Sequence, residues 1–186
     1  EMCIRDRGII MAIYYGDGTN SNGSSTGGRI VQCITSHKSG ITSHTGQSWS
    51  SNLGGLEATL TMSDSNNKVL IQYAINMSAA PNVYSGQARL VRGSTHIGAG
   101  VKGASNHVDG NNHFFTSYDA YSSYGLECLS GGFLDTPGSG THTYAIQMRS
   151  GYQNYAVWCN RSYADSNYYN SASASSFITL FEISHN

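Results

Sequence analysis

Hydrophobic and polar residues alternate with a period of two along much of the chain, which is the pattern of a β-strand with one buried face. The alternation is clearest in two neighbouring segments, 56–62 and 69–77, separated by turn-forming residues from Asp64 to Asn67. We therefore expect these two segments to pair as a β-hairpin. Further strands are predicted at 29–35, 86–92, 114–118, 126–134, 144–148, 155–159 and 177–183.

These segments predict an all-β fold, a two-sheet antiparallel β-sandwich or jelly roll of about eight strands, because each half-polar sheet must cover its apolar face with another. Residues 177–183 are among the most apolar in the chain, so we expect this last strand to lie centrally in a sheet. Residues 160–176 are rich in Tyr, Asn and Ser and are predicted to form a long loop.

Composition agrees with this fold class and narrows the choice of partners. The chain has 186 residues, 22 of them Gly, which suits one domain with many turns. Only 11% of the residues are charged, and the formal net charge is -1. Proteins that bind nucleic acids or anionic membranes need clustered Lys and Arg, so neither nucleic acid nor a membrane is expected as a partner.

Three regions are predicted from the order of the sequence. Residues 1–7 look like the translation of a transposase end sequence used in preparing sequencing libraries, and a plausible start follows at Met11. We expect 1–10 to be a non-native leader, 11–28 a flexible arm and 29–186 the β-sandwich domain. After Met11 there is no basic and then apolar leader, and no apolar run approaches the roughly 18 residues of a membrane span. Assembly in a cytoplasm is the expectation that follows.

Two glycine-rich motifs match known sites only in their letters. Residues 98–103 spell a dinucleotide-binding fingerprint, but the sequence after them does not predict the helix that this motif requires. Residues 23–27 spell a nucleophile elbow within a stretch of Gly, Ser and Asn, which predicts no strand-to-helix turn. No cofactor and no catalytic residue are predicted, and we expect a non-enzymatic protein.

Histidine and cysteine spacing predicts no metal site. The nearest cluster of metal-ligating types is His107, Asp109 and His113, which is more typical of a solvated loop. Cys33, Cys128 and Cys159 have no Cys-x-x-Cys spacing, and we expect them to be buried free thiols.

Aromatic residues are the one excess in the composition, with 13 Tyr. Tyrosine packs its ring and still forms hydrogen bonds, so loops of Tyr, Ser and Asn make adaptable recognition surfaces. The same tyrosines are equally typical of packing within and against the sandwich. The candidate glycan-stacking residues are Trp49, Tyr121, Tyr124, Tyr163 and Tyr169.

The two ends of the chain carry a resemblance. Residues 11–20 (MAIYYGDGTN) and 27–32 (GGRIVQ), with 133–137 (FLDTP), 143–149 (TYAIQMR), 160–162 (NRS) and 175–183 (SSFITLFEI), resemble small virion structural proteins of marine tailed phages. The similarity is to their jelly-roll, tail-fibre-like or head-decoration domains. It implies a subunit of the virion, assembled in a host bacterial cytoplasm, that forms a homo-oligomer, usually a trimer, and contacts other virion proteins.

Two functions from different classes follow. The first is a non-enzymatic phage virion structural protein, a capsid decoration or tail fibre-like subunit that also meets the host surface, where a glycan is a candidate partner. The alternative is a carbohydrate-binding module or lectin-like β-sandwich. A glycan-degrading enzyme would in addition need two carboxylates within roughly 5–10 Å of each other in a cleft.

Overall fold

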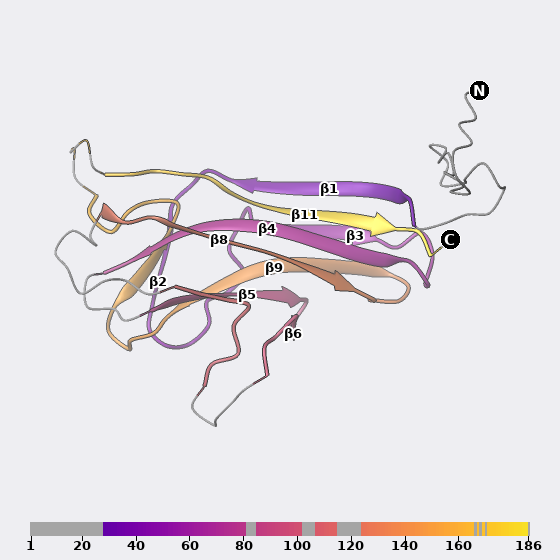
Figure 1. Cartoon of the computed structure of the whole chain (residues 1–186), viewed down its shortest axis with the longest axis horizontal. Coiled ribbons are helices and arrows are strands. Elements are labelled where there is room, and N and C mark those ends of the chain that lie inside the picture. Colours follow the sequence, from indigo (N-terminus) through magenta and orange to yellow (C-terminus); the bar gives the residue numbers. More distant parts are fainter. Residues whose placement is uncertain are drawn as a thin grey trace, which may run out of the picture.

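The computed structural model describes residues 28–80, 85–101, 107–114, 124–165, 167, 169 and 171–185. These residues form an all-β protein whose eleven strands lie in two antiparallel sheets, packed face to face as a β-sandwich (Figure 1). Among these residues there is no helix with the length and hydropathy of a membrane span. The predicted leader, 1–10, and all of the predicted arm but its last residue lie outside the described residues.

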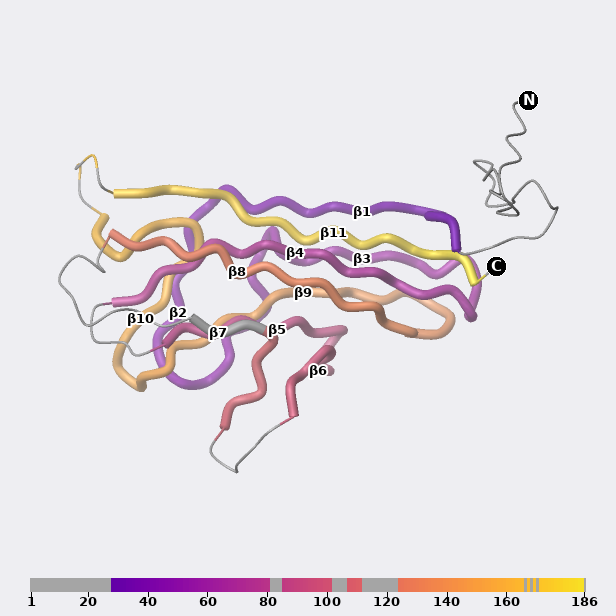
Figure 2. The backbone as a smooth tube through the Cα atoms, in the orientation of Figure 1, coloured from indigo at the N-terminus to yellow at the C-terminus, as the bar shows by residue number. Residues whose placement is uncertain are grey.

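The first sheet has six strands. Its four long strands lie in the order β1, β11, β4 and β8. The short strand β10 pairs with β4 beyond the end of β11, and β2 pairs with β10 beyond the end of β1. Figure 2 shows β11 lying between β1 and β4. The strands are β1 (Ile30–Lys38), β2 (Thr42–Thr45), β4 (Lys68–Ala79), β8 (Glu127–Asp135), β10 (Ala156–Cys159) and β11 (Ser176–Ile183).

The second sheet has five strands. Its order is β3, β9 and β5, after which β6 and β7 pair with different halves of β5. The strands are β3 (Glu57–Thr61), β5 (Gly86–Arg92), β6 (Thr95–Ile97), β7 (Asn112–Phe114) and β9 (Thr141–Ser150). The alternating residues of both sheets meet in a single hydrophobic core, which is the physical reason for the period of two in the sequence.

The predicted hairpin between residues 56–62 and 69–77 is wrong. β3 pairs with β9 in the five-stranded sheet, whereas β4 pairs with β11, β8 and β10 in the six-stranded sheet. The turn from Asp64 to Asn67 therefore carries the chain from one sheet to the other. The apolar faces of the two strands meet across the core, where Leu60 and Val69 are both buried.

The last strand lies centrally, as predicted, because β11 is hydrogen-bonded to β1 on one side and to β4 on the other. The structure has short strands in addition to the predicted ones. β2 and β6 have only four and three residues and are mostly polar, so their sequences show no alternation. Of the predicted strand 114–118, only residue 114 is described, and it belongs to β7.

Candidate functional site

The side chains of β11 divide between two faces of the six-stranded sheet. Ile178 and Leu180 are buried in the core between the sheets. Because successive side chains of a strand point to opposite sides, Phe177, Thr179 and Phe181 lie on the face turned away from the core. Phe177 is 40% exposed there. The five-stranded sheet covers the other face, whereas most of the described side chains on this outward face are exposed or half-buried.

A row of apolar side chains crosses this outward face from one side of the sheet to the other. Residues directly opposite each other in antiparallel strands share a face. The register places Cys33 opposite Phe181, Phe181 opposite Leu70, and Leu70 opposite Leu134. We call these four residues the outer row. Leu134, on β8, is 49% exposed.

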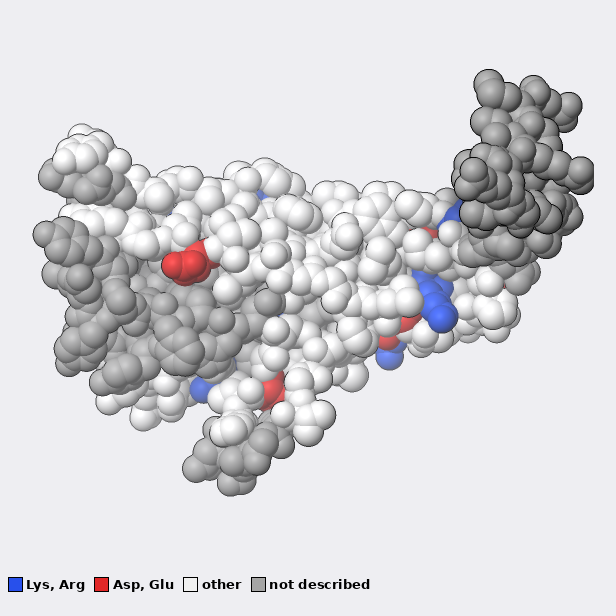
Figure 3. Space-filling view, viewed as in Figure 1, with Lys and Arg blue, Asp and Glu red and all other residues white. Residues whose placement is uncertain are grey.

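Two further rows follow the outer row on one side, and neither contains Asp, Glu, Lys or Arg. On its other side Lys68 of β4, opposite Ile183, shares the face. Figure 3 shows this sparseness of charge over the middle of β11 and β4, with charged side chains gathered toward the ends. A sheet face that exposes a continuous apolar row such as the outer row is typical of an interaction surface. The two rows are Thr35, Thr179, Gln72 and Gly132, and His37, Phe177, Ala74 and Ser130.

Two of the three cysteines that the structure describes lie on the same outward face. Cys33 belongs to the outer row and Cys128 stands opposite Asn76, and both thiols are exposed. The prediction that all three thiols are buried is therefore wrong for these two, because their strands turn them away from the core. Cys159 is buried, and burial raises the pKa of its thiol although hydrogen bonding to Ser176 lowers it.

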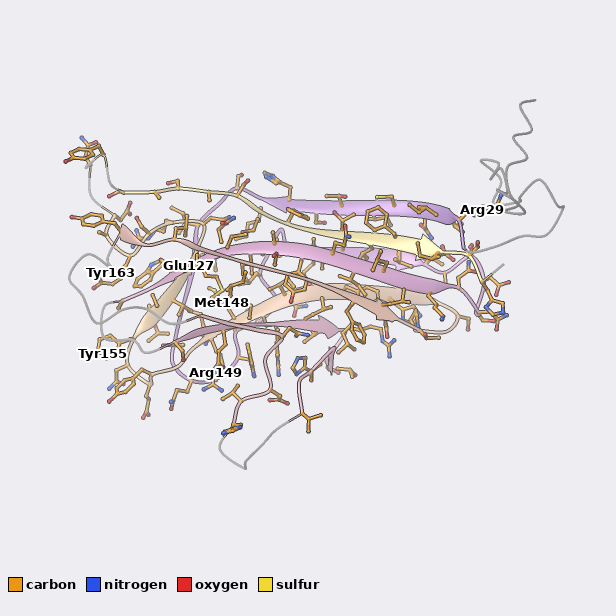
Figure 4. All side chains as sticks on the ribbon, in the orientation of Figure 1. Arg29, Glu127, Met148, Arg149, Tyr155 and Tyr163 are labelled. Atoms are coloured by element: carbon orange, nitrogen blue, oxygen red, sulfur yellow. The ribbon has the colours of Figure 1, made fainter. Side chains whose placement is uncertain are left out.

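An aromatic cluster extends this surface toward one end of the sandwich. The rings of Trp158 on β10 and Tyr163 meet edge to face with centroids 5.0 Å apart, and the guanidinium of Arg161 lies 5.2 Å from the centroid of Trp158. Figure 4 places Tyr163 and Tyr155 at the end of the sandwich away from Arg29.

The five candidate stacking residues come from different parts of the fold. Tyr163 and Tyr169 belong to the connection between β10 and β11, where Tyr169 is 86% exposed. Tyr124 precedes β8 and is half-buried, while Tyr121 lies outside the described residues. Trp49 instead lies beside the five-stranded sheet.

Trp49 lies in the segment between β2 and β3, which runs along β9 beyond the end of β3. Backbone hydrogen bonds hold this segment in place, from the nitrogen of Ser50 to the oxygen of Met148 (2.9 Å) and from the nitrogen of Leu53 to the oxygen of Ile146 (3.0 Å). The segment thus acts as an additional strand at the edge of the five-stranded sheet, and it positions the Trp49 ring beside β9 and β5.

Two arginines lie over the Trp49 ring. The guanidinium carbon of Arg89 is 4.5 Å from the ring centroid and that of Arg149 is 5.8 Å from it. Arg89 on β5 lies opposite Gln147 on β9, and its neighbours Ala88 and Leu90 are buried in the core. Arg89 therefore points outward from the five-stranded sheet, and so does Arg149, two residues from Gln147 on the same strand. We call Trp49, Arg89 and Arg149 the tryptophan–arginine cluster.

A chain of hydrogen bonds orients this cluster. The Arg89 Nε donates to the Oε1 of Gln147 (2.8 Å), and the Nε2 of Gln147 donates to the Oδ1 of Asn52 (2.9 Å). The Nδ2 of Asn52 in turn donates to the Oε2 of Glu57 (2.8 Å). Burial lowers the pKa of both Arg89 and Arg149, and the charge of Asp109 opposes that shift.

Two other acidic side chains are engaged inside the fold. The Oδ2 of Asp135 pairs with Arg92 Nη1 (2.6 Å) and accepts a hydrogen bond from the hydroxyl of Tyr144 (2.8 Å). Burial, with this hydrogen bond, raises the pKa of Tyr144. Glu182 is fully buried and accepts four hydrogen bonds near the end of β11. Because both carboxylates are bonded to groups within the fold, we assign them a structural role.

The residues that could ligate a metal are dispersed. Within the described part of the chain, no three His, Cys, Asp or Glu side chains gather as a metal site would require. In the predicted cluster of His107, Asp109 and His113, the carboxylate of Asp109 instead lies 3.8 Å from Nδ1 of His96. His96 also shares a hydrogen bond with Asn111 (2.9 Å).

No protein-family model matches the sequence, and the comparison with curated proteins gives no match. The outward face and the tryptophan–arginine cluster are therefore interpreted from their own chemistry. Of the two, sequence reasoning identified only Trp49. Arg89 and Arg149 are outward-facing polar residues of strands that the sequence predicted from their apolar residues. That the two arginines share a face follows only from the pairing of β5 with β9.

Proposed function

We propose that this protein is a non-enzymatic structural subunit that assembles with copies of itself through the outward face of its six-stranded sheet. The observation that carries the proposal is the outer row, an apolar track across four strands with uncharged rows beside it. A face with few charges can be covered by another copy of the chain with little like-charge repulsion, whereas a highly charged face would need a complementary partner.

The flat area of this face is smaller than the area that a standard interface buries on each partner. Four strands spaced about 4.8 Å apart, over the eight residues of β11 at about 3.3 Å each, span a projected area of roughly 500 Å². A standard interface buries about 800 Å² on each partner. We therefore expect an oligomer that forms over a micromolar range of protein concentration rather than one that never dissociates.

We infer that the sandwich is a jelly roll. When β2, β6 and β10 are set aside, the other eight strands have the orders β1, β11, β4, β8 and β3, β9, β5, β7, in which β7 is as short as β6. The first strand thus pairs with the last, and the second with the next to last, which is the wrapped order of a double-sheet jelly roll.

This order supports the resemblance to jelly-roll subunits of marine tailed phages, and with it the proposal of a trimeric virion protein, a capsid decoration or tail fibre-like subunit. In such a trimer the outer rows of three copies would meet near the threefold axis. Other virion proteins and the host surface are the further partners that this proposal names.

Size-exclusion chromatography with light scattering on the full chain tests the proposal. We expect a mass of three chains at about 100 µM protein and a decrease on dilution. Leu134→Lys places a charge in the outer row and should give a monomer with an unchanged circular dichroism spectrum. Val101→Lys is the matched control, because Val101 is fully exposed on a loop away from the outer row and should leave the mass unchanged.

Three results would overturn parts of this proposal. A wild-type monomer at about 100 µM would refute self-association. An oligomer that survives Leu134→Lys would show that the contact lies elsewhere. A dimer that Leu134→Lys dissociates would leave the face as the contact and refute the threefold arrangement.

A further inference from the structure

The tryptophan–arginine cluster has guanidinium donors that the fold does not use. Within the described part of the chain, Arg89 donates from Nε to Gln147, and Arg149 donates from Nε to the oxygen of Ser150 (3.3 Å). Neither residue has a recorded hydrogen bond or ion pair from its terminal Nη atoms to the described residues. Among the described residues, the forked ends of these two half-buried guanidiniums thus have no hydrogen-bond or ion-pair partner, and such forks match the geometry of a carboxylate.

Both guanidiniums of the cluster carry a positive charge. Arg89 and Arg149 together carry two positive charges, and Asp109 is the carboxylate whose charge acts on both of them. The carboxylate of Asp109 forms no ion pair with either arginine, whereas it lies 3.8 Å from His96. Among the described residues no ion pair neutralises either guanidinium, so a carboxylate can pair with both.

Neutral amides lie next to Arg89. Gln147 accepts a hydrogen bond from Arg89 and donates one to Asn52, and both side chains are half-buried at the surface of the sheet. Amides of this kind exchange hydrogen bonds with sugar hydroxyls, and Trp49 supplies an aromatic ring next to them. The combination fits a ligand that carries both a carboxylate and hydroxyl groups.

We propose that the tryptophan–arginine cluster binds a carboxylate-bearing saccharide, with Arg89 and Arg149 holding the carboxylate and the amides of Gln147 and Asn52 contacting hydroxyl groups. The cluster lies on the outward face of the five-stranded sheet, on the opposite side of the sandwich from the outer row. Assembly through the outer row therefore leaves every copy of the cluster accessible, and a trimer presents three of them to a surface glycan.

Tryptophan fluorescence of the full chain tests the proposal, with Trp158→Phe as the background so that Trp49 is the single reporter. The probes are sialyllactose and trigalacturonate, with lactose as the neutral sugar. We expect both acidic saccharides to change the emission, with a dissociation constant on the order of 1 mM per site, and lactose to have no effect. Acetate and inorganic phosphate at the same concentrations should bind at least tenfold more weakly.

Variants separate the cluster from the rest of the surface. Arg149→Gln should weaken binding of the acidic saccharides at least tenfold. Arg149→Lys keeps the charge but removes the fork, and should weaken binding several-fold. Arg161→Gln is the matched control, because Arg161 lies over Trp158 in the other sheet, and should leave binding unchanged.

Several outcomes would refute the assignment. Equal binding of lactose and sialyllactose would remove the role of the carboxylate. Phosphate or acetate binding as tightly as the saccharides would show an anion site without sugar recognition. Unchanged affinity in Arg149→Gln, with an unaltered melting temperature, would place any binding elsewhere. None of these outcomes depends on the oligomeric state, which is measured separately by light scattering.

Discussion

Replacing Glu182 by Gln should cost the protein about 3 kcal/mol of its free energy of unfolding at neutral pH. The carboxylate is fully buried near the end of β11. Its Oε1 accepts hydrogen bonds from Nδ2 of Asn67 (2.7 Å) and from the backbone nitrogen (2.9 Å) and hydroxyl (2.7 Å) of Ser63. Its Oε2 accepts one from Nε2 of Gln32 (2.5 Å).

The magnitude follows from the pKa of this carboxyl group. Burial by itself would raise the pKa of Glu182, but the hydrogen bonds from Asn67, Gln32 and Ser63 outweigh it and lower the pKa from 4.5 to about 2. One pKa unit corresponds to about 1.4 kcal/mol, so ionisation of Glu182 stabilises the folded state by about 3 kcal/mol. A glutamine has the same shape but only one acceptor oxygen, and its amide NH₂ would face a donor.

The pH dependence gives this prediction its sign. Because the folded-state pKa lies below the unfolded one, the stabilisation is complete above about pH 4.5 and is lost as the pH falls toward 2. Urea unfolding of wild type and Glu182→Gln, at equal protein concentration, should show a difference of about 3 kcal/mol at pH 7 that shrinks steadily below pH 4.5.

A matched control comes from the same sheet. Glu127 is exposed at the start of β8, and Glu127→Gln should change the free energy of unfolding by less than about 0.5 kcal/mol at every pH. The reasoning would be refuted if Glu182→Gln cost less than about 1 kcal/mol at pH 7, or if its effect stayed the same between pH 7 and pH 3.

Two further predictions concern the core and the outward face. Gly131→Ala should destabilise the protein by about 1–3 kcal/mol in urea unfolding, since an added Cβ would stand 2.7 Å from the hydroxyl of Tyr73. Gly132→Ala, whose Cβ would meet only the oxygen of Ile71 at 3.3 Å, should be milder, and equal losses in the two variants would contradict this packing. Thiol labelling followed by mass spectrometry should modify Cys33 rapidly in dilute protein and more slowly as the protein concentration rises, because association covers the outer row. Cys159 should react only on unfolding, and a Cys33 rate independent of concentration would speak against association through this face.

The candidate sites were only partly predictable from the sequence. Trp49 stood out as a rare aromatic residue among polar ones, but the arginines beside it come from β5 and β9, far apart in the sequence. The outer row has the same origin, since its four residues belong to four strands. Within its own strand, each of these residues is at an outward-facing position, where polar residues are expected.

By itself, the sequence determined the fold class, because a strand with one buried face must repeat every two residues, and this requirement is local. It also determined that the last strand is central, because an apolar segment such as 177–183 is stable only when strands pair with it on both sides. Only the tertiary structure decided the pairing: Asp64 to Asn67 read locally as a hairpin turn, yet β3 and β4 lie in different sheets. The physical reason is that a turn and two amphipathic strands satisfy the same pattern whether their apolar faces lie side by side or face each other across a core.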